Sequence, residues 1–401
     1  MKNIPIGITI QRAGLFLFAV SLPISHVPAQ IGIGLAIIGW VYSGLVNKHW
    51  QFTRHSFLGI LLFYVCWNIF AAILSPRALH SLNAVADNEW PLLIMLMMYW
   101  TIDDVQFLRK LLFAFLATAS VAMLYAIWQT FLGIEFYRPM TLDWMGGYYR
   151  AVGFYGFYLT FAALAMAVFF FSFTLFLEVK KQRALSGFLA LVSFLAVVAS
   201  FARSIWLSLG VGIPLLGFIK NKRIGLSATG ILILVVVVGL FIDPTIRARA
   251  ESIFDAGQNQ TRLNLWKTSL NIAQHYPILG VGEDNWDYFF PLHKADGYYD
   301  TTVHPHNDYL TVLVSSGVPG LIAFFGMWMV ALRAGFSAWK KAREPELKAF
   351  ALGATLSLLG FLVGSFFQNY YGTFVNCLGW WFVVGILMTT QKLVERNQTM
   401  S

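Results

Sequence analysis

Two histidines lie within a five-residue segment, His304-Pro305-His306-Asn307-Asp308, directly before an apolar run from Tyr309 to Leu332. A neutral imidazole at such a membrane boundary can act as a general base. The N-terminus of a helix disfavours the imidazolium ion, so we expect His306 to stay neutral and to be the base. We expect His304 and Asn307 to contact substrate, and helix capping is the alternative function of these polar residues.

The two histidines also raise the question of a zinc site. Zinc takes three or four ligands from the protein, and no convincing third ligand motif accompanies His304 and His306. We therefore expect no metal at this segment.

Arg203 lies in Phe201-Ala202-Arg203-Ser204-Ile205-Trp206, between two apolar runs with almost no loop. An arginine at or just inside the membrane edge costs roughly 0–3 kcal/mol, which makes a functional partner such as phosphate the first hypothesis. Snorkelling of the side chain to the interface is the alternative. Arg150 and Arg262 are further candidates for an anion, with Asp255 as the other possible partner of Arg262.

Three carboxylates, Glu283, Asp284 and Asp287, lie close together in the same polar region as Arg262. Carboxylates can serve as bases, but spacing alone does not separate a catalytic pair from a solvated surface. We expect Glu283 to contact substrate.

These residues must be positioned by membrane-spanning helices. The chain has 401 residues, of which 58% are hydrophobic and 12% charged, whereas soluble domains carry about 25% charged residues. This composition excludes a soluble enzyme and a disordered chain, and the long apolar runs exclude a porin-like barrel. The sequence therefore predicts an all-α polytopic membrane protein.

The sequence predicts twelve spans, some of them short or interrupted, notably the first two around Pro23 and Pro28. They cover residues 7–25, 28–46, 56–75, 83–101, 107–132, 151–177, 185–202, 204–219, 224–242, 306–332, 347–367 and 374–392. An even number of spans places both termini on one side of the membrane. The charge pattern predicts that this side is cytoplasmic, because the ends on that side carry most of the 28 lysines and arginines.

The basic residues on the other, periplasmic side are mostly arginines, whose planar guanidinium binds phosphate in a bidentate manner. They are Arg77, Arg138, Arg150, Arg203, Arg247, Arg249, Arg262, Lys267 and Lys294. Since these residues run against the charge rule, we expect an anionic substrate for the set. Surface salt bridges are the alternative for each single arginine. The net charge of +9 is explained by membrane topology, so no nucleic acid partner is expected.

One periplasmic loop, residues 243–305, separates nine spans in residues 1–242 from three spans and a short tail in residues 306–401. An amphipathic helix is predicted to begin in this loop with Thr261 as its N-cap, on the spacing of Leu263, Trp266, Leu270 and Ala273. Arg262 would then open the helix and oppose its dipole. Pro277 and the Gly280-Val281-Gly282 turn are expected to end the helical region.

The combination of motifs resembles the O-antigen ligase/polymerase superfamily of integral membrane glycosyltransferases. The motifs are Ala202-Arg203-Ser204-Ile205-Trp206, Thr261-Arg262-Leu263-Asn264-Leu265-Trp266, His275-Tyr276-Pro277-Ile278-Leu279-Gly280-Val281-Gly282, His304-Pro305-His306-Asn307-Asp308-Tyr309-Leu310 and Gly317-Val318-Pro319-Gly320-Leu321. The resemblance implies a GT-C-type fold in the bacterial inner membrane. It also implies a glycan donor carried on undecaprenyl diphosphate and an active site that faces the periplasm.

Within this superfamily, ligases transfer the O-antigen to a sugar hydroxyl of lipid A–core, whereas polymerases join repeat units. Protein O-glycosyltransferases of the superfamily usually carry an extra C-terminal soluble region, and this chain ends soon after Glu395. The compact chain with a single dominant loop resembles a ligase, and a polymerase is the alternative.

The resemblance implies that Arg203 and Arg262, with Arg150, stabilise the leaving diphosphate, while His306 deprotonates the acceptor. Trp206 and Glu283 are expected to contact substrate. Direct displacement predicts inversion at the anomeric carbon, and no cofactor or obligate protein partner is expected. A transporter of the same lipid would instead show internal repeats and ionisable residues near mid-membrane, and neither is evident.

Overall fold

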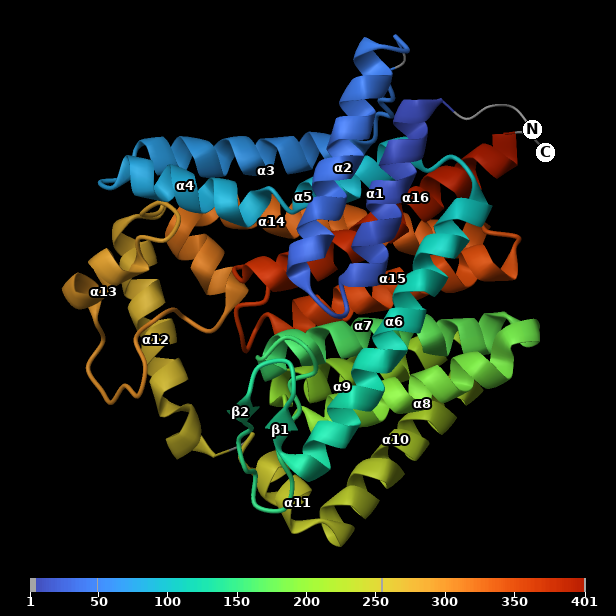
Figure 1. The fold of residues 1–401 in the computed structure, drawn as a ribbon. Coiled ribbons are helices and arrows are strands. Elements are labelled where there is room, and N and C mark those ends of the chain that lie inside the picture. The colour runs from blue at the N-terminus through green and yellow to red at the C-terminus, as the bar shows by residue number, and fades with distance from the viewer. Residues whose placement is uncertain (1–4, 49, 254, 400–401) are drawn as a thin grey trace.

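The computed structural model describes residues 5–48, 50–253 and 255–399, and most of them are helical (Figure 1). Ten helices in these residues are long and apolar enough to cross a membrane. They are α2 (His26–Leu45), α3 (Ser56–Ile73), α6 (Val105–Leu132), α7 (Tyr158–Glu178), α8 (Arg183–Ala199, preceded by the 3-10 turn Lys180–Gln182), α9 (Arg203–Lys220), α10 (Lys222–Ile242), α14 (Asp308–Lys341), α15 (Pro345–Gly364) and α16 (Phe374–Thr399). The prediction of an all-α polytopic membrane protein agrees with this architecture. The exception is a small antiparallel hairpin of β1 (Ile134–Glu135) and β2 (Met140–Thr141).

The expected span at residues 83–101 is not one helix. It is divided between α4 (Ala78–Glu89) and α5 (Leu92–Thr101), and Pro91 lies at the division. Proline cannot donate a backbone hydrogen bond, and α4 ends in the polar run Asp87-Asn88-Glu89, so the apolar part has ten residues. The first expected span is also shorter, because α1 (Ile6–Ser21) ends before Pro23. Two of the twelve predicted segments are therefore short apolar helices.

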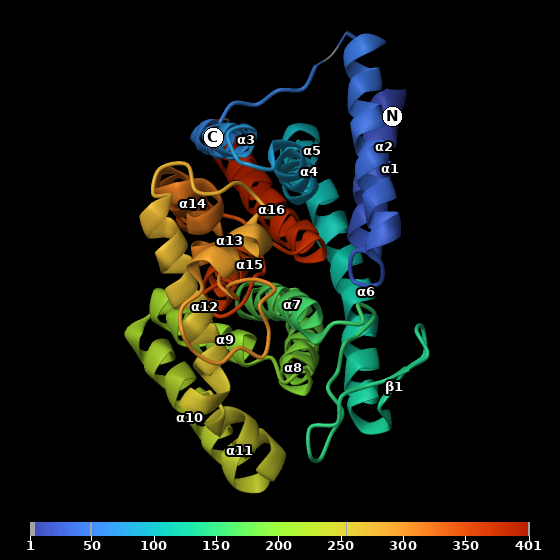
Figure 2. The same ribbon diagram turned by 90° about the vertical axis from the view of Figure 1, so that its left-hand side faces the viewer.

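The best-buried helices are α7 and α16, which lie inside the bundle, whereas α10 lies at its outside. Trp328 of α14 and Trp380 and Trp381 of α16 are fully buried and pack together with Tyr371. Helices α1 and α2 form an antiparallel pair at one edge of the molecule (Figure 2). The functional residues are carried by the ends of the interior helices and by the segments between them.

Helix α14 is broken at Gly317, whose φ of 65° lies in the left-handed region. A β-carbon at this position would overlap the carbonyl oxygen of Ile278, so glycine alone fits. Pro319 has no N–H, and the N–H of Val318 donates to the carbonyl oxygen of Pro277 at 2.8 Å. The motif around Gly317 and Pro319 thus interrupts the hydrogen-bond ladder of the helix.

The interruption frees two helix carbonyls, and the incoming loop uses both. The N–H of Val281 donates to the carbonyl oxygen of Val314 at 2.8 Å, and that of Gly282 donates to Ser315 at 2.9 Å. The glycine turn after α12 is therefore fixed to the broken helix by backbone hydrogen bonds. Two motifs far apart in the sequence form one structural unit here.

The segment 243–305 contains α11 (Pro244–Glu251), α12 (Ala256–His275) and α13 (Trp286–His293), which lie away from the two chain ends in Figure 1. The expected amphipathic helix exists and ends before Pro277, but it begins at Ala256, so Thr261 is not its N-cap. The hydroxyl of Thr261 instead accepts a hydrogen bond from the N–H of Asp300 at 3.0 Å. Arg262 consequently lies inside the helix and not at its N-terminus.

Candidate active site

A cavity of about 190 Å³ lies between the start of α9 and the α12 helix. It is lined by Arg203, Ser204, Leu207, Ile253, Asn259, Arg262, Leu263, Trp266 and Phe367. We call this cavity the arginine pocket. It brings together Arg203 and Arg262, two of the residues that the sequence singled out.

Arg203 is placed by the tight turn between α8 and α9. Phe201 adopts a left-handed φ of 52°, and the N–H of Ala202 donates to the hydroxyl of Ser200 at 3.2 Å. The Arg203 guanidinium donates to the hydroxyl of Ser252 at 3.1 Å and to its carbonyl oxygen. Arg203 begins α9, so the positive end of the helix dipole adds to its charge.

Four arginines, Arg150, Arg203, Arg249 and Arg262, lie near one another, and we call them the arginine cluster. Burial and the charges of the neighbouring arginines lower the pKa of Arg249 to about 10, and burial lowers that of Arg262. Arg150 forms an ion pair with Asp143 at 3.3 Å. Within the described residues, the other three form no salt bridge with a carboxylate. The cluster therefore has an excess of positive charge that an anion would neutralise.

Arg249 was not predicted as a site residue. It was one of nine basic residues expected on the periplasmic side, and nothing in its sequence neighbourhood distinguished it. Its Nε donates to the carbonyl oxygen of Phe201 at 3.1 Å, which holds α11 against the turn before Arg203. This contact depends on the tertiary structure.

His306 lies next to the arginine pocket with a left-handed φ of 52°. Its Nδ1 lies 3.0 Å from the amide oxygen of Gln368. Because that oxygen only accepts, Nδ1 carries the proton and the lone pair is on Nε2. Burial, followed by the charge of Arg262, lowers the pKa of His306, whereas the Gln368 hydrogen bond acts in the opposite direction. His306 thus has the protonation state of a general base.

His304 packs against His306, with ring centroids 4.1 Å apart. Its Nδ1 accepts a hydrogen bond from the backbone N–H of His306 at 3.1 Å. Burial and the charge of His306 lower the pKa of His304 to about 4, so it is neutral at physiological pH. In the part of the chain that the structure describes, no group of three or more His, Cys, Asp or Glu residues is arranged to hold a metal ion.

Asn307 has the capping role that the sequence left as an alternative. Its side-chain oxygen accepts from the N–H of Leu310 at 3.0 Å, and its amide donates to the carbonyl oxygen of Phe366 at 3.1 Å. The residue is buried. Both ends of the side chain are used to start α14 and to hold the next loop. The expected contact of Asn307 with substrate stays a prediction.

Trp206 lies away from the polar site. Its Nε1 donates to the carbonyl oxygen of Val197 at 3.1 Å, and its ring lines an apolar cavity between α8, α9 and α10. It does not line the arginine pocket. The structure therefore gives this residue an apolar environment, and its expected contact with substrate stays a prediction.

A second cavity, of about 310 Å³, lies on the other side of His304. It is lined by Ala84, Asp87, Asn88, Glu283, Asp284, Trp286, Val303, His304, Pro305, Thr311, Val314, Ser315, Asn369 and Gly372. We call it the carboxylate pocket. Glu283 accepts from the amide of Asn88 at 3.0 Å, and burial raises its pKa to about 7.

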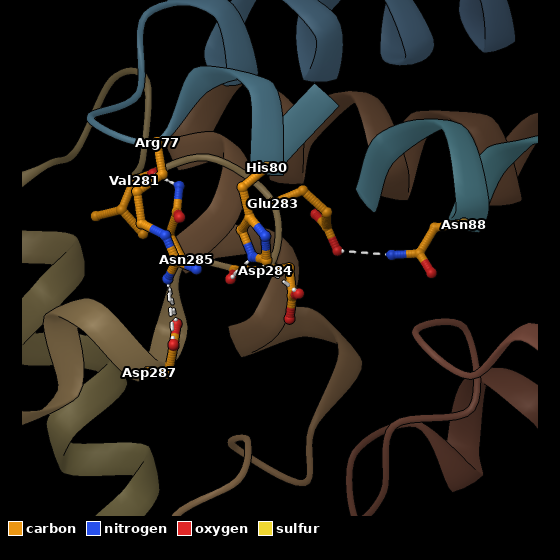
Figure 3. A network of polar contacts seen from close by, with 8 residues as sticks. All are labelled: Arg77, His80, Asn88, Val281, Glu283, Asp284, Asn285 and Asp287. Atoms are coloured by element: carbon orange, nitrogen blue, oxygen red, sulfur yellow. Dashed lines mark hydrogen bonds and ion pairs between the residues drawn. The ribbon is translucent and has the colours of Figure 1, made fainter. Parts of the chain in front are cut away.

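Helix α4 holds the Glu283 segment through three polar contacts (Figure 3). Arg77 pairs with Asp287 at 2.9 Å, His80 lies 3.1 Å from Asp284, and Asn88 bonds to Glu283. These contacts, with the backbone bonds to α14, fix the acidic segment relative to the pocket. The expected fourth span is not apolar throughout, because its first part, α4, carries the polar residues that make these contacts.

The loop before α16 connects both pockets with His306. Phe367 lines the arginine pocket, Gln368 bonds to His306, and Asn369 lines the carboxylate pocket. Three consecutive residues of this loop thus contact the first cavity, His306 and the second cavity.

The segment before α14 shows the same arrangement. Trp266, on the wall of the arginine pocket, donates its indole N–H to the carbonyl oxygen of Pro305 at 3.1 Å. Pro305 and His304 line the carboxylate pocket. The segment that carries His306 is therefore in contact with residues of both pockets.

Comparisons with known proteins show similarity to one family model and to a bacterial protein. Residues 188–325 match the family model described as O-antigen ligase. An uncharacterized protein of Haemophilus influenzae is similar to the chain, with 24% identity over 316 residues that cover 72% of the chain and 75% of the relative. The matched segment contains Arg203, Arg262, His306 and the broken part of α14. The resemblance seen in the motifs is confirmed by the match of residues 188–325 to the O-antigen ligase family model.

Proposed function

We propose that this protein is an O-antigen ligase. It transfers a glycan from undecaprenyl diphosphate to a sugar hydroxyl of lipid A–core at the periplasmic face of the inner membrane. The observation that carries the proposal is the arginine cluster, which has few carboxylate partners and lies beside a neutral, oriented His306. The negative charge of a diphosphate would neutralise the positive charge of the cluster.

The reaction needs one displacement. Nε2 of His306 accepts the proton of the acceptor hydroxyl as its oxygen attacks the anomeric carbon. The bond from that carbon to the diphosphate oxygen breaks, and the diphosphate leaves with the electron pair. Arg203 and Arg262 stabilise the developing charge. Attack opposite the leaving group inverts the anomeric configuration, and the chemistry needs no covalent enzyme intermediate.

Positive charge at the leaving group performs the task that a divalent cation has in many other diphosphate reactions. We therefore propose metal-independent transfer. Activity should persist in EDTA, and strong inhibition that added metal reverses would contradict the arginine-based account.

The proposed orientation has both termini in the cytoplasm, with residues 243–305 forming a periplasmic subdomain between spans in 1–242 and 306–401. The excess of Lys and Arg on the cytoplasmic ends supports it. The separation of the chain ends from α11–α13 in Figure 1 is compatible with it.

A polymerase of the same family is the second candidate function. It would use the same lipid-linked donor, the same arginines and the same base, and would differ in its acceptor, which would be a second lipid-linked glycan.

Reconstitution of the purified protein distinguishes these functions. The protein in detergent is mixed with polyprenyl-diphosphate-linked O-antigen and rough lipopolysaccharide, without metal or nucleotide. A ladder shift on the lipopolysaccharide, absent with His306→Ala, is the expected result. Growth of the lipid-linked glycan when single repeat units are offered, without a shift on lipopolysaccharide, would instead establish a polymerase.

A further inference from the structure

The proposed displacement leaves the carboxylate pocket without an assigned role. Its polar walls include the side chains of Asn88, Thr311, Ser315 and Asn369, which can donate as well as accept hydrogen bonds. Trp286 contributes an apolar ring surface. Mixed hydrogen-bonding groups with an aromatic face suit a sugar ring, which has hydroxyl groups at its rim and C–H groups on its faces.

The charges of the two pockets are opposite. Asp87, Glu283 and Asp284 line the carboxylate pocket, whereas the arginine pocket has Arg203 and Arg262. Carboxylates disfavour a phosphate through like charge, and they accept hydrogen bonds from neutral hydroxyls. The arginine pocket would therefore favour the anionic donor, and the carboxylate pocket would favour a neutral sugar.

Glu283 is the best-positioned group in the carboxylate pocket. The amide of Asn88 donates to it at 3.0 Å, and the preceding residues Val281 and Gly282 are bonded to the backbone of α14. The Asn88 hydrogen bond fixes the carboxylate, and the backbone bonds fix the segment that carries it. Such a carboxylate is preorganised to accept hydrogen bonds from substrate hydroxyl groups, because little ordering is needed on binding.

The position of His304 connects this pocket to the reaction. Its ring forms part of the pocket wall and lies 4.1 Å, centroid to centroid, from the ring of His306. We propose that the carboxylate pocket binds the sugar that provides the acceptor hydroxyl, and that Glu283 determines acceptor specificity by accepting hydrogen bonds from its hydroxyl groups. This proposal rests on glycosyl transfer as the proposed function.

Steady-state transfer with purified Glu283→Gln, varying one substrate at a time, tests the proposal. The assay is run above about pH 8, where Glu283, with its pKa of about 7, is ionised. The KM for the lipopolysaccharide acceptor should rise about tenfold, because hydrogen bonds to a charged group are stronger than neutral ones. The KM for the lipid-linked donor and kcat at saturating acceptor should stay within about twofold. Asn88→Ala, which removes the amide that holds Glu283, should raise the acceptor KM in the same direction.

The matched control is Glu395→Gln, because Glu395 is an exposed carboxylate near the end of α16 whose contact is to Gln391. It should change neither KM. An unchanged acceptor KM in Glu283→Gln, or a rise in the donor KM instead, overturns the proposal. Absence of transfer by the wild-type protein would refute the proposed function itself. The wild-type protein is assayed before the variants, so this result is distinguished from a failure of the acceptor-pocket proposal. If Glu283→Gln is not monodisperse on size-exclusion chromatography, Asn88→Ala replaces it, and an unchanged acceptor KM in that variant overturns the proposal.

Discussion

The Nδ1 atom of His306 lies 3.0 Å from the side-chain oxygen of Gln368, although the two residues are 62 positions apart. This hydrogen bond fixes the tautomer in which Nε2 is free to accept a proton. Burial lowers the pKa of His306 below its usual 6.5, so the neutral form persists into mildly acidic solution. Gln368 is therefore a positioning residue for the proposed base.

Replacing Gln368 with glutamate should move the acid limb of the pH profile. A carboxylate beside His306 stabilises the imidazolium and raises its pKa, so the neutral base forms only at higher pH. We expect the midpoint of the acid limb of kcat/KM to rise by about one pH unit or more. Gln368→Leu should lower kcat by about 10- to 100-fold without that displacement, since it removes orientation and adds no charge. Profiles that coincide for wild type and both variants would refute the positioning role.

Arg203→Lys should be nearly as inactive as Arg203→Ala. Lysine keeps the charge but lacks the planar fork that binds two phosphate oxygens at once. The expected loss in kcat/KM for both is about 100-fold or more, measured in the reconstituted transfer reaction. A lysine variant with full activity would show that charge alone is sufficient.

Inorganic pyrophosphate should raise the melting temperature of the detergent-solubilised protein. A ligand that binds the folded state stabilises it by about 2.7 kcal/mol at 100 times its Kd. The increase should disappear in Arg203→Ala and persist in Arg343→Ala, which removes an exposed arginine outside the cluster. An equal increase in all three proteins would indicate binding elsewhere.

Gly317→Ala should destabilise the fold and lower activity together. The left-handed backbone costs a residue other than glycine roughly 1–2 kcal/mol, and the added β-carbon would meet the carbonyl oxygen of Ile278. The matched control is Gly379→Ala in α16, where a β-carbon meets no atom within 4 Å and alanine favours the helix. Thermal unfolding should show a lower melting temperature for the first variant and not for the second.

Several features of the fold were predictable from local sequence. Long apolar runs predict helices because a membrane forces backbone groups to bond within their own segment, and the helices lie where those runs are. The end of α12 before Pro277 was also predictable, because proline and glycine act locally. The prediction of one helix at residues 83–101 was wrong, because α4 is polar and Pro91 separates it from α5. The contacts of this region with a loop about 200 residues later, such as Arg77 with Asp287, were not predictable from local sequence.

For the candidate site, the sequence by itself determined which residue types were available: arginines against the charge rule, and histidines before a span. Only the tertiary structure decided how they are used. It added Arg249 and Gln368, assigned Asn307 to capping, and separated Trp206 from the polar pockets. The physical reason is that charge and composition are properties of the chain, whereas a hydrogen bond or a shared cavity depends on which distant segments the packed helices bring together.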